Sequence, residues 1–225
     1  MWCVADLDDA YIARMEDVLA TYEKPRHAAE PVLCLDEKPV SLHADVRPSR
    51  PARPGHVAKC DNEYRRCGTA NIFAVVEPKT GRHLNSATPN RKAGEFAAVL
   101  ARIEKEYAQA RKIHLVMDNL KIHCQKSLLD HFGPEEGARL WQRFRVHYTP
   151  KHGSWLNQAE IELSMIARQC LGSRRFPTLA DLQKELKAWN QAANQKQIRI
   201  QWTFNRKAAR RKFGYVTNSS TRSKT

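Results

Sequence analysis

The sequence lacks the features of secreted, membrane-spanning or zinc-binding chains. Its six cysteines are scattered, with no CxxC pair and no histidine partner at zinc-ligand spacing. No apolar run approaches the ~18 residues that span a bilayer. The first residues also lack the basic-then-apolar pattern of a signal peptide. We therefore expect a cytoplasmic protein with reduced thiols and no membrane contact.

The length of the chain limits the number of domains. The 225 residues show no internal repeat and suffice for one sizeable core, but not for two large domains. We expect an N-terminal helix and linker over 1–30, a main domain over 31–195 and a basic tail over 196–225. The last ~10 residues are polar and expected to be disordered.

Charge is the clearest compositional feature. Lysine and arginine number 38 against 24 acids, which gives a net charge of +14 and a pI near 9.7. Residues 1–30 carry a net charge of −4, so the excess belongs to the rest of the chain. A basic field concentrates polyanions, which makes nucleic acid the leading partner and a nucleoid-associated location the expectation. The alternative is a merely soluble basic surface.

The apolar patterns alternate between strand and helix periods, which predicts an α/β fold: a mixed sheet with flanking helices. The predicted order is three strands, helix, strand, helix, strand and two further helices. Strands are expected at 32–36, 40–46, 71–78, 112–118 and 144–148. Helices are expected at 8–22, 91–109, around 124–132, 157–171 and 178–194. The Pro- and Arg-rich stretch at 47–66 is predicted to be an exposed basic loop.

Three acids stand where chemistry usually occurs. Asp36 is expected to close the first strand and Asp118 the strand after the long helix, and ligands gather at such ends. At about 100° per residue, Glu160 falls on the edge of an apolar helical stripe and Glu162 is turned away from it. The alternative for Glu160 is a capping box with Asn157 as the N-cap.

Converging carboxylates repel one another unless a cation offsets their charge. Mg²⁺, or Mn²⁺ in its place, is held by carboxylate oxygens while leaving room for substrate phosphates. Two such ions ~4 Å apart can flank a phosphodiester during an in-line displacement. The acids and the basic field together favour phosphoryl transfer on nucleic acid.

Three segments, CLDEK, VMDNLKIH and HYTPKHGSWLNQAEIELS, resemble in this order the catalytic domain of IS630/Tc1/mariner transposases. The resemblance runs from about Trp2 to about Tyr215. It implies an RNase H-like fold in which Asp36, Asp118 and Glu160 form a catalytic, metal-binding DDE triad. It also implies DNA cleavage at insertion-sequence ends, strand transfer and a TA target dinucleotide.

Complete members of that family carry helix-turn-helix modules ahead of the catalytic domain. This chain begins where those modules should have ended, so we expect a truncated transposase. A separate helix-turn-helix partner and a homodimer remain open. Two rival functions also remain: an inactive relic that only binds double-stranded DNA, and a non-transposase nuclease on the same fold.

Other residues near the triad are candidates for nucleic-acid contact. Asn119 and His123 follow Asp118 and either position a phosphate or metal water, or serve as hydrogen-bonded structural groups. Further candidates are Lys151, His152, Ser154, Arg65, Arg66, Arg206, Lys207, Arg210 and Arg211. The alternative for such basic runs is a solvated helix face.

Overall fold

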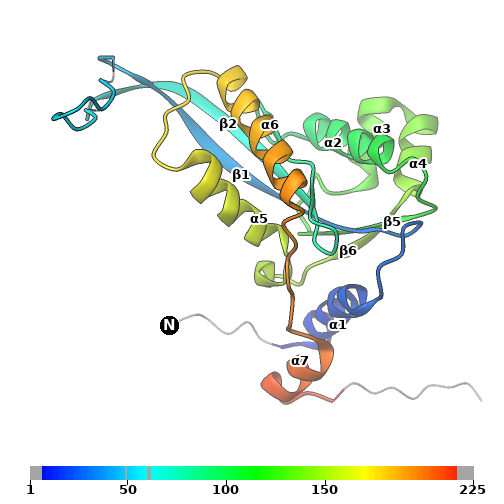
Figure 1. Ribbon diagram of the computed structural model, residues 1–225. Coiled ribbons are helices and arrows are strands. Elements are labelled where there is room, and N and C mark those ends of the chain that lie inside the picture. Colours follow the sequence, from blue (N-terminus) through cyan, green and yellow to red (C-terminus); the bar gives the residue numbers. More distant parts are fainter. Residues whose placement is uncertain (1–6, 49, 60–61, 217–225) are drawn as a thin grey trace, which may run out of the picture.

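A central mixed sheet organises the chain. The computed structural model describes residues 7–48, 50–59 and 62–216. Within them a six-stranded sheet has the order β3-β2-β1-β5-β6, with β4 paired to β2 (Figure 1). β1 pairs antiparallel with β2 and parallel with β5, and β5 pairs parallel with β6. The strands are β1 (Val32–Asp45), β2 (Tyr64–Glu77), β3 (Arg82–His83), β4 (Ser86–Thr88), β5 (Ile113–Met117) and β6 (Phe144–Tyr148).

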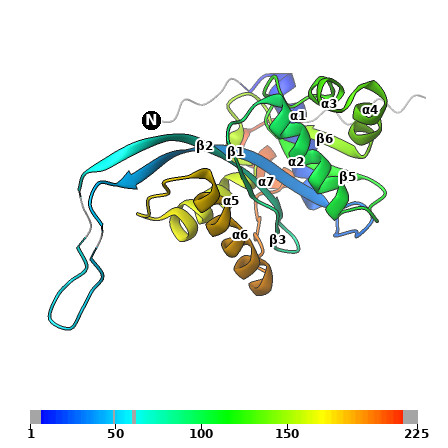
Figure 2. The ribbon, with the colours of Figure 1, turned by 90° about the horizontal axis from the view of Figure 1, so that it is seen from above.

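Helices cover both faces of this sheet (Figures 1 and 2). They are α1 (Asp9–Glu23), α2 (Ala93–Glu106), α3 (Gln125–Phe132), α4 (Pro134–Gln142), η1 (Ser154–Leu156), α5 (Ala159–Met165), η2 (Ile166–Leu171), α6 (Leu179–Lys196) and α7 (Arg206–Phe213). Helices α2, α3 and α4 pack on one face, while α5, α6, α1 and α7 lie on the other. This arrangement confirms the expected mixed sheet with flanking helices.

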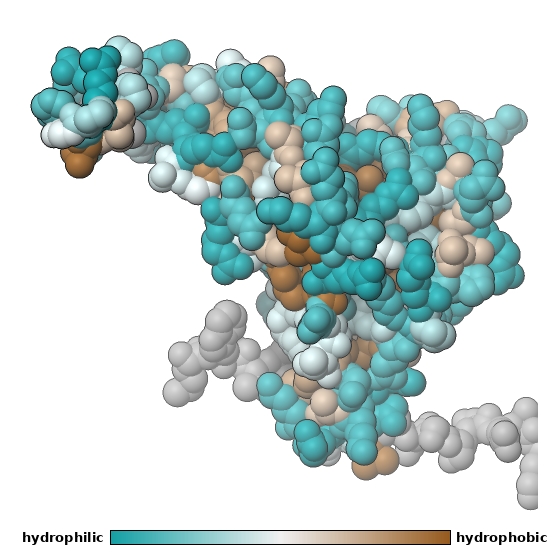
Figure 3. Space-filling model, in the orientation of Figure 1, coloured by the Kyte–Doolittle hydropathy of each residue, from teal (hydrophilic) through white to brown (hydrophobic). Residues whose placement is uncertain are grey.

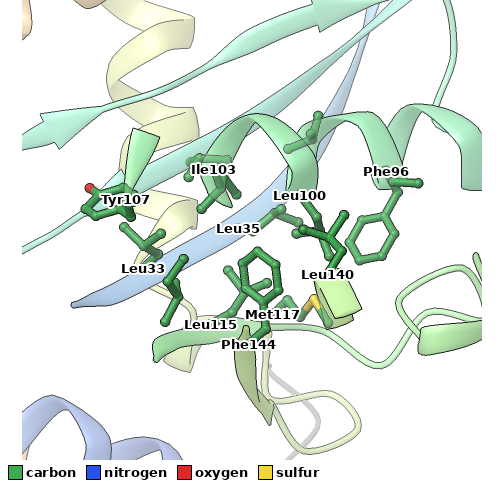
Figure 4. Packing of buried hydrophobic residues seen from close by; sticks show 14 of the residues in the cluster. Leu33, Leu35, Phe96, Leu100, Ile103, Tyr107, Leu115, Met117, Leu140 and Phe144 are labelled. Carbon is green, nitrogen blue, oxygen red and sulfur yellow. The ribbon is translucent and has the colours of Figure 1, made fainter. Parts of the chain in front are cut away.

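Strand alternation divides the core between the two faces. Leu33 and Leu35 of β1 join Phe73 of β2 in the cluster beneath α2 (Figure 4). Cys34 points the other way, into a cluster with residues of α1. Because side chains alternate across a strand, neighbouring residues of β1 serve opposite faces. The same alternation reaches the acidic residues that follow Leu35.

The β1–β2 hairpin is much longer than the sequence predicts. The expected strands 32–36 and 40–46 form one strand across Pro39, and β2 begins at Tyr64. Pairing of β1 with β5 ends at Cys34, so β1 beyond this point is an edge strand, where proline is tolerated. The outer part of the hairpin, residues 45–48, 50–59 and 62–66, projects from the body as an arm (Figure 2). Hydrophilic residues cover most of its visible surface (Figure 3).

Two helices were not predicted. Helix α4 begins at Pro134, directly after the Gly133 that ends α3. Helix α7 lies within the expected basic tail and packs against α1, where Arg206 pairs with Glu23 and Arg210 with Glu16. The tail is therefore structured as far as Val216. The expected disorder at the end of the chain falls mainly on 217–225, outside the described residues.

The cysteines and helices of the described residues bear on the expected reduced thiols and the expected lack of membrane contact. Cys34 and Cys170 are free and buried, and Cys67 and Cys124 are free and half-buried. Cys3 and Cys60 lie outside the described residues. No helix in the described ranges has both the length and the apolar character needed to cross a bilayer.

A chain of hydrogen bonds fastens α1 to the sheet. His114 of β5 and His147 of β6 place Nδ1 and Nε2 2.8 Å apart, and Nδ1 of His147 lies 2.7 Å from Oδ2 of Asp17 on α1. Burial lowers the pKa of His114 to about 4, so this ring is neutral near pH 7 and can donate to an unprotonated Nε2 of His147. His147 in turn donates to Asp17. This hydrogen bond lowers the pKa of Asp17.

We predict that Asp17→Asn destabilises the protein near pH 7 and not in acid. Since the pKa of Asp17 is lowered on folding, its contribution is present above the ordinary value of 3.8 and lost as pH falls through the lowered value. Because Asp17 is half exposed, screening limits the loss to about 1 kcal/mol. Thermal unfolding at pH 7 and pH 3 tests this, with exposed Asp9→Asn as the control. An equal loss at both pH values would contradict it.

Candidate active site

Asp36 on β1 and Asp118, directly after the end of β5, occupy matching positions. The parallel ladder between β1 and β5 ends with Cys34 opposite Val116, and each aspartate lies two residues further on. Neighbouring strands are about 4.8 Å apart, so the two carboxylates emerge side by side. The sequence predicted that Asp36 ends its strand. It does not, because β1 continues into the arm. It marks the point where β1 leaves β5.

The expected orientation of the third acid is wrong. Glu160 is exposed, whereas Glu162 is completely buried and contacts His83 and Asn85. The predicted stripe included Ala167, which is only half-buried and lies in the π-helical η2, where α-helical spacing no longer holds. The buried face of α5 is therefore shifted toward Glu162. Glu160 stands on the opposite flank, open to solvent.

Electrostatics nevertheless join Glu160 to the aspartates. Burial first, and then the carboxylates of Glu160, Glu37 and Asp118, raise the pKa of Asp36 to about 7 against one backbone hydrogen bond that lowers it. That bond is donated by the Glu37 N–H to Oδ1 of Asp36 at 2.8 Å. Asp36, Asp118 and Glu160 thus form one acidic cluster with an excess of negative charge. We refer to these three residues as the acidic cluster.

His123 lies behind Asp118, away from solvent. Its Nε2 is 2.7 Å from Oε1 of Glu37, and its Nδ1 is 2.7 Å from Oδ1 of Asp118 and 3.0 Å from the Asp118 carbonyl oxygen. Burial lowers the pKa of His123, but hydrogen bonds to Asp118 and Glu37 outweigh it and raise the pKa to about 10. The ring is therefore an imidazolium, and the hydrogen-bonded structural role is the one that its position favours over direct DNA contact.

Two sets of residues offer potential ligands for a cation. Glu37, Asp118 and His123 bring potential ligand atoms within 4.8 Å of one another. Both nitrogens of His123 already face carboxylate or carbonyl oxygens, however, so this ring is not free to bind a metal. In the acidic cluster, Asp118 pairs with His123, but Asp36 and Glu160 have no cationic side chain within ion-pair distance among the described residues. Hard carboxylate oxygens with uncompensated charge fit Mg²⁺ or Mn²⁺.

Asn157 places the start of α5 against β1. Its Nδ2 donates to the carbonyl oxygen of Leu35 at 2.8 Å, and its Oδ1 accepts from the Ala159 N–H at 3.1 Å. The Asn157 N–H donates to the Ser154 carbonyl oxygen, so the capping box considered for Glu160 does not form. Tyr22 of α1 also donates to the carbonyl oxygen of Leu156. The segment before Glu160 is thereby fixed to the residue before Asp36.

The remaining sequence candidates divide into exposed and paired groups. Asn119, Lys151, His152 and Ser154 are exposed, and Arg65 and Arg66 are exposed on the β2 side of the arm rather than in a loop. In α7, Lys207 and Arg211 are exposed, whereas Arg206 and Arg210 are bound to acids of α1. Sequence reasoning missed Glu37, although strand alternation places it beside Leu35 on the α2 face.

A match to a family model shows which family this chain belongs to. The model of the DDE superfamily endonucleases matches residues 31–183, about two thirds of the chain. The chain belongs to the DDE superfamily endonucleases. None of the curated proteins compared matches it. The match to this superfamily confirms the transposase-type resemblance seen in the sequence.

Solved structures agree with the DDE superfamily fold. The Mos1 mariner paired end complex with Mn matches with a TM-score of 0.54 at 16% identity, over 88% of this chain and 61% of that chain. The Mos1 Strand Transfer Complex matches with a TM-score of 0.55 at 15% identity, over 85% and 57%. At this identity the likeness shows the RNase H-like fold alone. The chain spans about three fifths of the length of these Mos1 chains.

We predict that Asp36→Asn stabilises this DDE-family chain in alkaline, chelated solution. The pKa of Asp36 is raised on folding from 3.8 to about 7, so its favourable contribution is full below 3.8 and is lost as pH rises through 7. Removing the charge should add about 2 kcal/mol at pH 8 and almost nothing at pH 4. Thermal unfolding with a chelator measures this, and exposed Asp130→Asn should change little. A gain that does not vary with pH would contradict the prediction.

Proposed function

We propose that the chain catalyses divalent-metal-dependent cleavage of DNA at insertion-sequence ends and transfers the freed 3′-hydroxyl to target DNA. The observation that carries this proposal is the acidic cluster, with two register-matched aspartates and Glu160 close enough to raise the pKa of Asp36. Membership of the DDE superfamily supports the reaction class. The TA target dinucleotide belongs to the proposal through the IS630/Tc1/mariner resemblance alone.

Asp36, Asp118 and Glu160 would hold two Mg²⁺ or Mn²⁺ ions. Bound ions would supply Lewis-acid stabilisation to the attacking and leaving oxygens of an in-line displacement at phosphorus. The chain's own residues do the rest: His123 orients Asp118, while Asn157 keeps the start of α5 beside β1. Mos1 structures with Mn and with Mg support a divalent ion. The same cluster can serve cleavage and joining because both steps displace an oxygen at phosphorus.

We predict that Asp36→Asn and Glu160→Gln each reduce Mg²⁺-dependent nicking by about 100-fold or more, since each removes a ligand worth several kcal/mol. DNA binding should be kept or slightly tightened because a negative charge near a polyanion is removed. Gel shift and cleavage on the same proteins measure both properties.

Exposed Asp130→Asn serves as the matched charge control and should nick like the unmodified chain. An equal loss of binding and cleavage in the two cluster variants would point to a binding or folding role for these acids. A product in which the 3′-hydroxyl is joined to target DNA separates a transposase from a simple nuclease on the same fold.

The basic surface supports duplex DNA as the substrate. Arg65 and Arg66 are exposed on the arm, Lys151 and His152 lie in the loop before α5, and Lys207 is exposed on α7. Lysine and arginine on phosphates add affinity that depends on salt and carries no sequence information. We propose that these groups track the DNA backbone. Recognition of the inverted repeats would then require a helix-turn-helix module, and a homodimer would bring two ends together.

Helix α7 offers a matched test of this surface. We predict that Lys207→Gln with Arg211→Gln lowers the dependence of log K on log salt by about 1.8, because two phosphate contacts are lost. Arg206→Gln with Arg210→Gln should change it less and lower the melting temperature instead, because those cations bind Glu23 and Glu16. Duplex binding between about 50 and 200 mM salt measures the slopes. A larger slope change for the acid-bound pair would contradict the prediction.

A further inference from the structure

Glu162 is a fully buried carboxylate on the helix that carries Glu160. Ionised side chains are seldom buried unless they are paired. Nδ1 of His83 lies 2.9 and 3.0 Å from the two carboxylate oxygens of Glu162, and the Asn85 amide also donates to Oε1. The carboxylate is therefore held from the strand side of α5 by two donors.

The donors are themselves fixed. The backbone N–H of His83 donates to Oδ1 of Asn194 on α6 at 2.7 Å, and Nε2 of His83 lies 3.2 Å from the carbonyl oxygen of Ile198. Oδ1 of Asn85 accepts from the Val75 N–H at 2.8 Å. Strand β3, the segment that leads to β4, and helix α6 thus form a rigid socket for Glu162.

Helix geometry connects this socket to the acidic cluster. Two residues along an α-helix correspond to about 200°, so Glu162 and Glu160 stand on opposite flanks of the buried face of α5. With side-chain tips about 5–6 Å from the axis, a rotation of about 20° moves a tip by about 2 Å. Catalytic constellations tolerate only about 0.5 Å. The rotation of α5 must therefore be closely fixed.

Asn157 anchors the segment before α5, but within α5 itself Glu162 is the one described residue whose side chain forms hydrogen bonds. Helix α5 has seven residues and runs into the π-helical η2, and its apolar contacts come chiefly from Ala159 and Leu163. Apolar contacts are non-directional, so they resist sliding and turning less than hydrogen bonds do. A hydrophobic residue in place of a buried ion pair is often as stable or more stable. A buried carboxylate here is thus better explained by orientation than by stability.

We propose that Glu162 is a positioning residue: held by His83 and Asn85, it fixes the rotation of α5 and so aims Glu160 at Asp36 and Asp118. This inference rests on the proposed function, in which Glu160 holds a divalent ion. Glu162 touches neither the aspartates nor, on this proposal, the DNA.

The test uses Glu162→Gln, which keeps the shape of the side chain and one acceptor oxygen. Mn²⁺ affinity is measured by electron paramagnetic resonance on the DNA-free protein, and nicking is measured under single turnover and corrected for the folded fraction. We expect 10- to 100-fold weaker Mn²⁺ binding and a similarly lower rate, with the secondary structure retained. Leu100→Val, in the core beneath α2, is the control for destabilisation that leaves α5 in place and should keep wild-type affinity.

Glu160→Gln is measured under the same conditions, so that the positioning role of Glu162 and the proposed function can be contradicted separately. If Glu160→Gln loses Mn²⁺ binding and nicking while Glu162→Gln keeps both, the positioning role is overturned and the proposed function stands. If Glu160→Gln keeps both, the proposed function itself fails. Should Glu162→Gln not fold, Asn85→Ser removes one donor to Glu162, together with the acceptor of the Val75 N–H, and leaves the sequence of α5 unchanged. It should then show an intermediate loss, and wild-type affinity in that variant would overturn the inference.

Discussion

Repulsion between like charges is the constraint on which the rest of this structure depends. Burial, together with the charges of Glu160, Glu37 and Asp118, raises the pKa of the half-buried Asp36 to about 7. Left to themselves, such carboxylates would move apart or take up protons. They are held together because each is fastened from behind: the β1–β5 ladder places both aspartates, His123 holds Asp118, and Asn157 holds the loop before Glu160.

Strand alternation lets β1 support the site from both faces at once. Asp36 points to the side of α5, and the next residue, Glu37, points to the side of α2 and meets His123. His123 then reaches back to Asp118 at the end of β5, so one imidazolium offsets two carboxylates on opposite sides of the sheet edge. Departure of β1 from β5 at Cys34 opens this edge to solvent. The same departure produces the arm, so the accessible cluster and the projecting hairpin have one structural cause.

Local patterns in the sequence correctly predicted the buried strands of the sheet. The apolar run ending at Met117 and the strand FRVHY were predicted to within a residue or two, because burial and periodicity follow directly from the local order of apolar and polar residues. The face of α5 was misjudged because it depends on partners remote in sequence: His83 lies 79 residues before Glu162. The length of β1 was misjudged because Pro39 reads as a strand break, and only the end of the ladder with β5 makes it acceptable. Pairing of α7 with α1 joins residues nearly 200 apart and has no local signal.

The basic surface and the acidic cluster do not oppose each other, because they act over different ranges. At physiological ionic strength exposed charges are screened beyond about 8 Å, so a cation near Asp36 experiences chiefly the carboxylates around it. On the proposed function, duplex DNA, with a phosphate charge about every 1.7 Å along its axis, would span many screening lengths and experience the summed field of the arm, the α5 loop and α7. Attraction of the polyanion therefore does not require neutralisation of the cluster. Close approach of a phosphodiester to Asp36 does, because there the separation falls within a screening length and the carboxylates repel it.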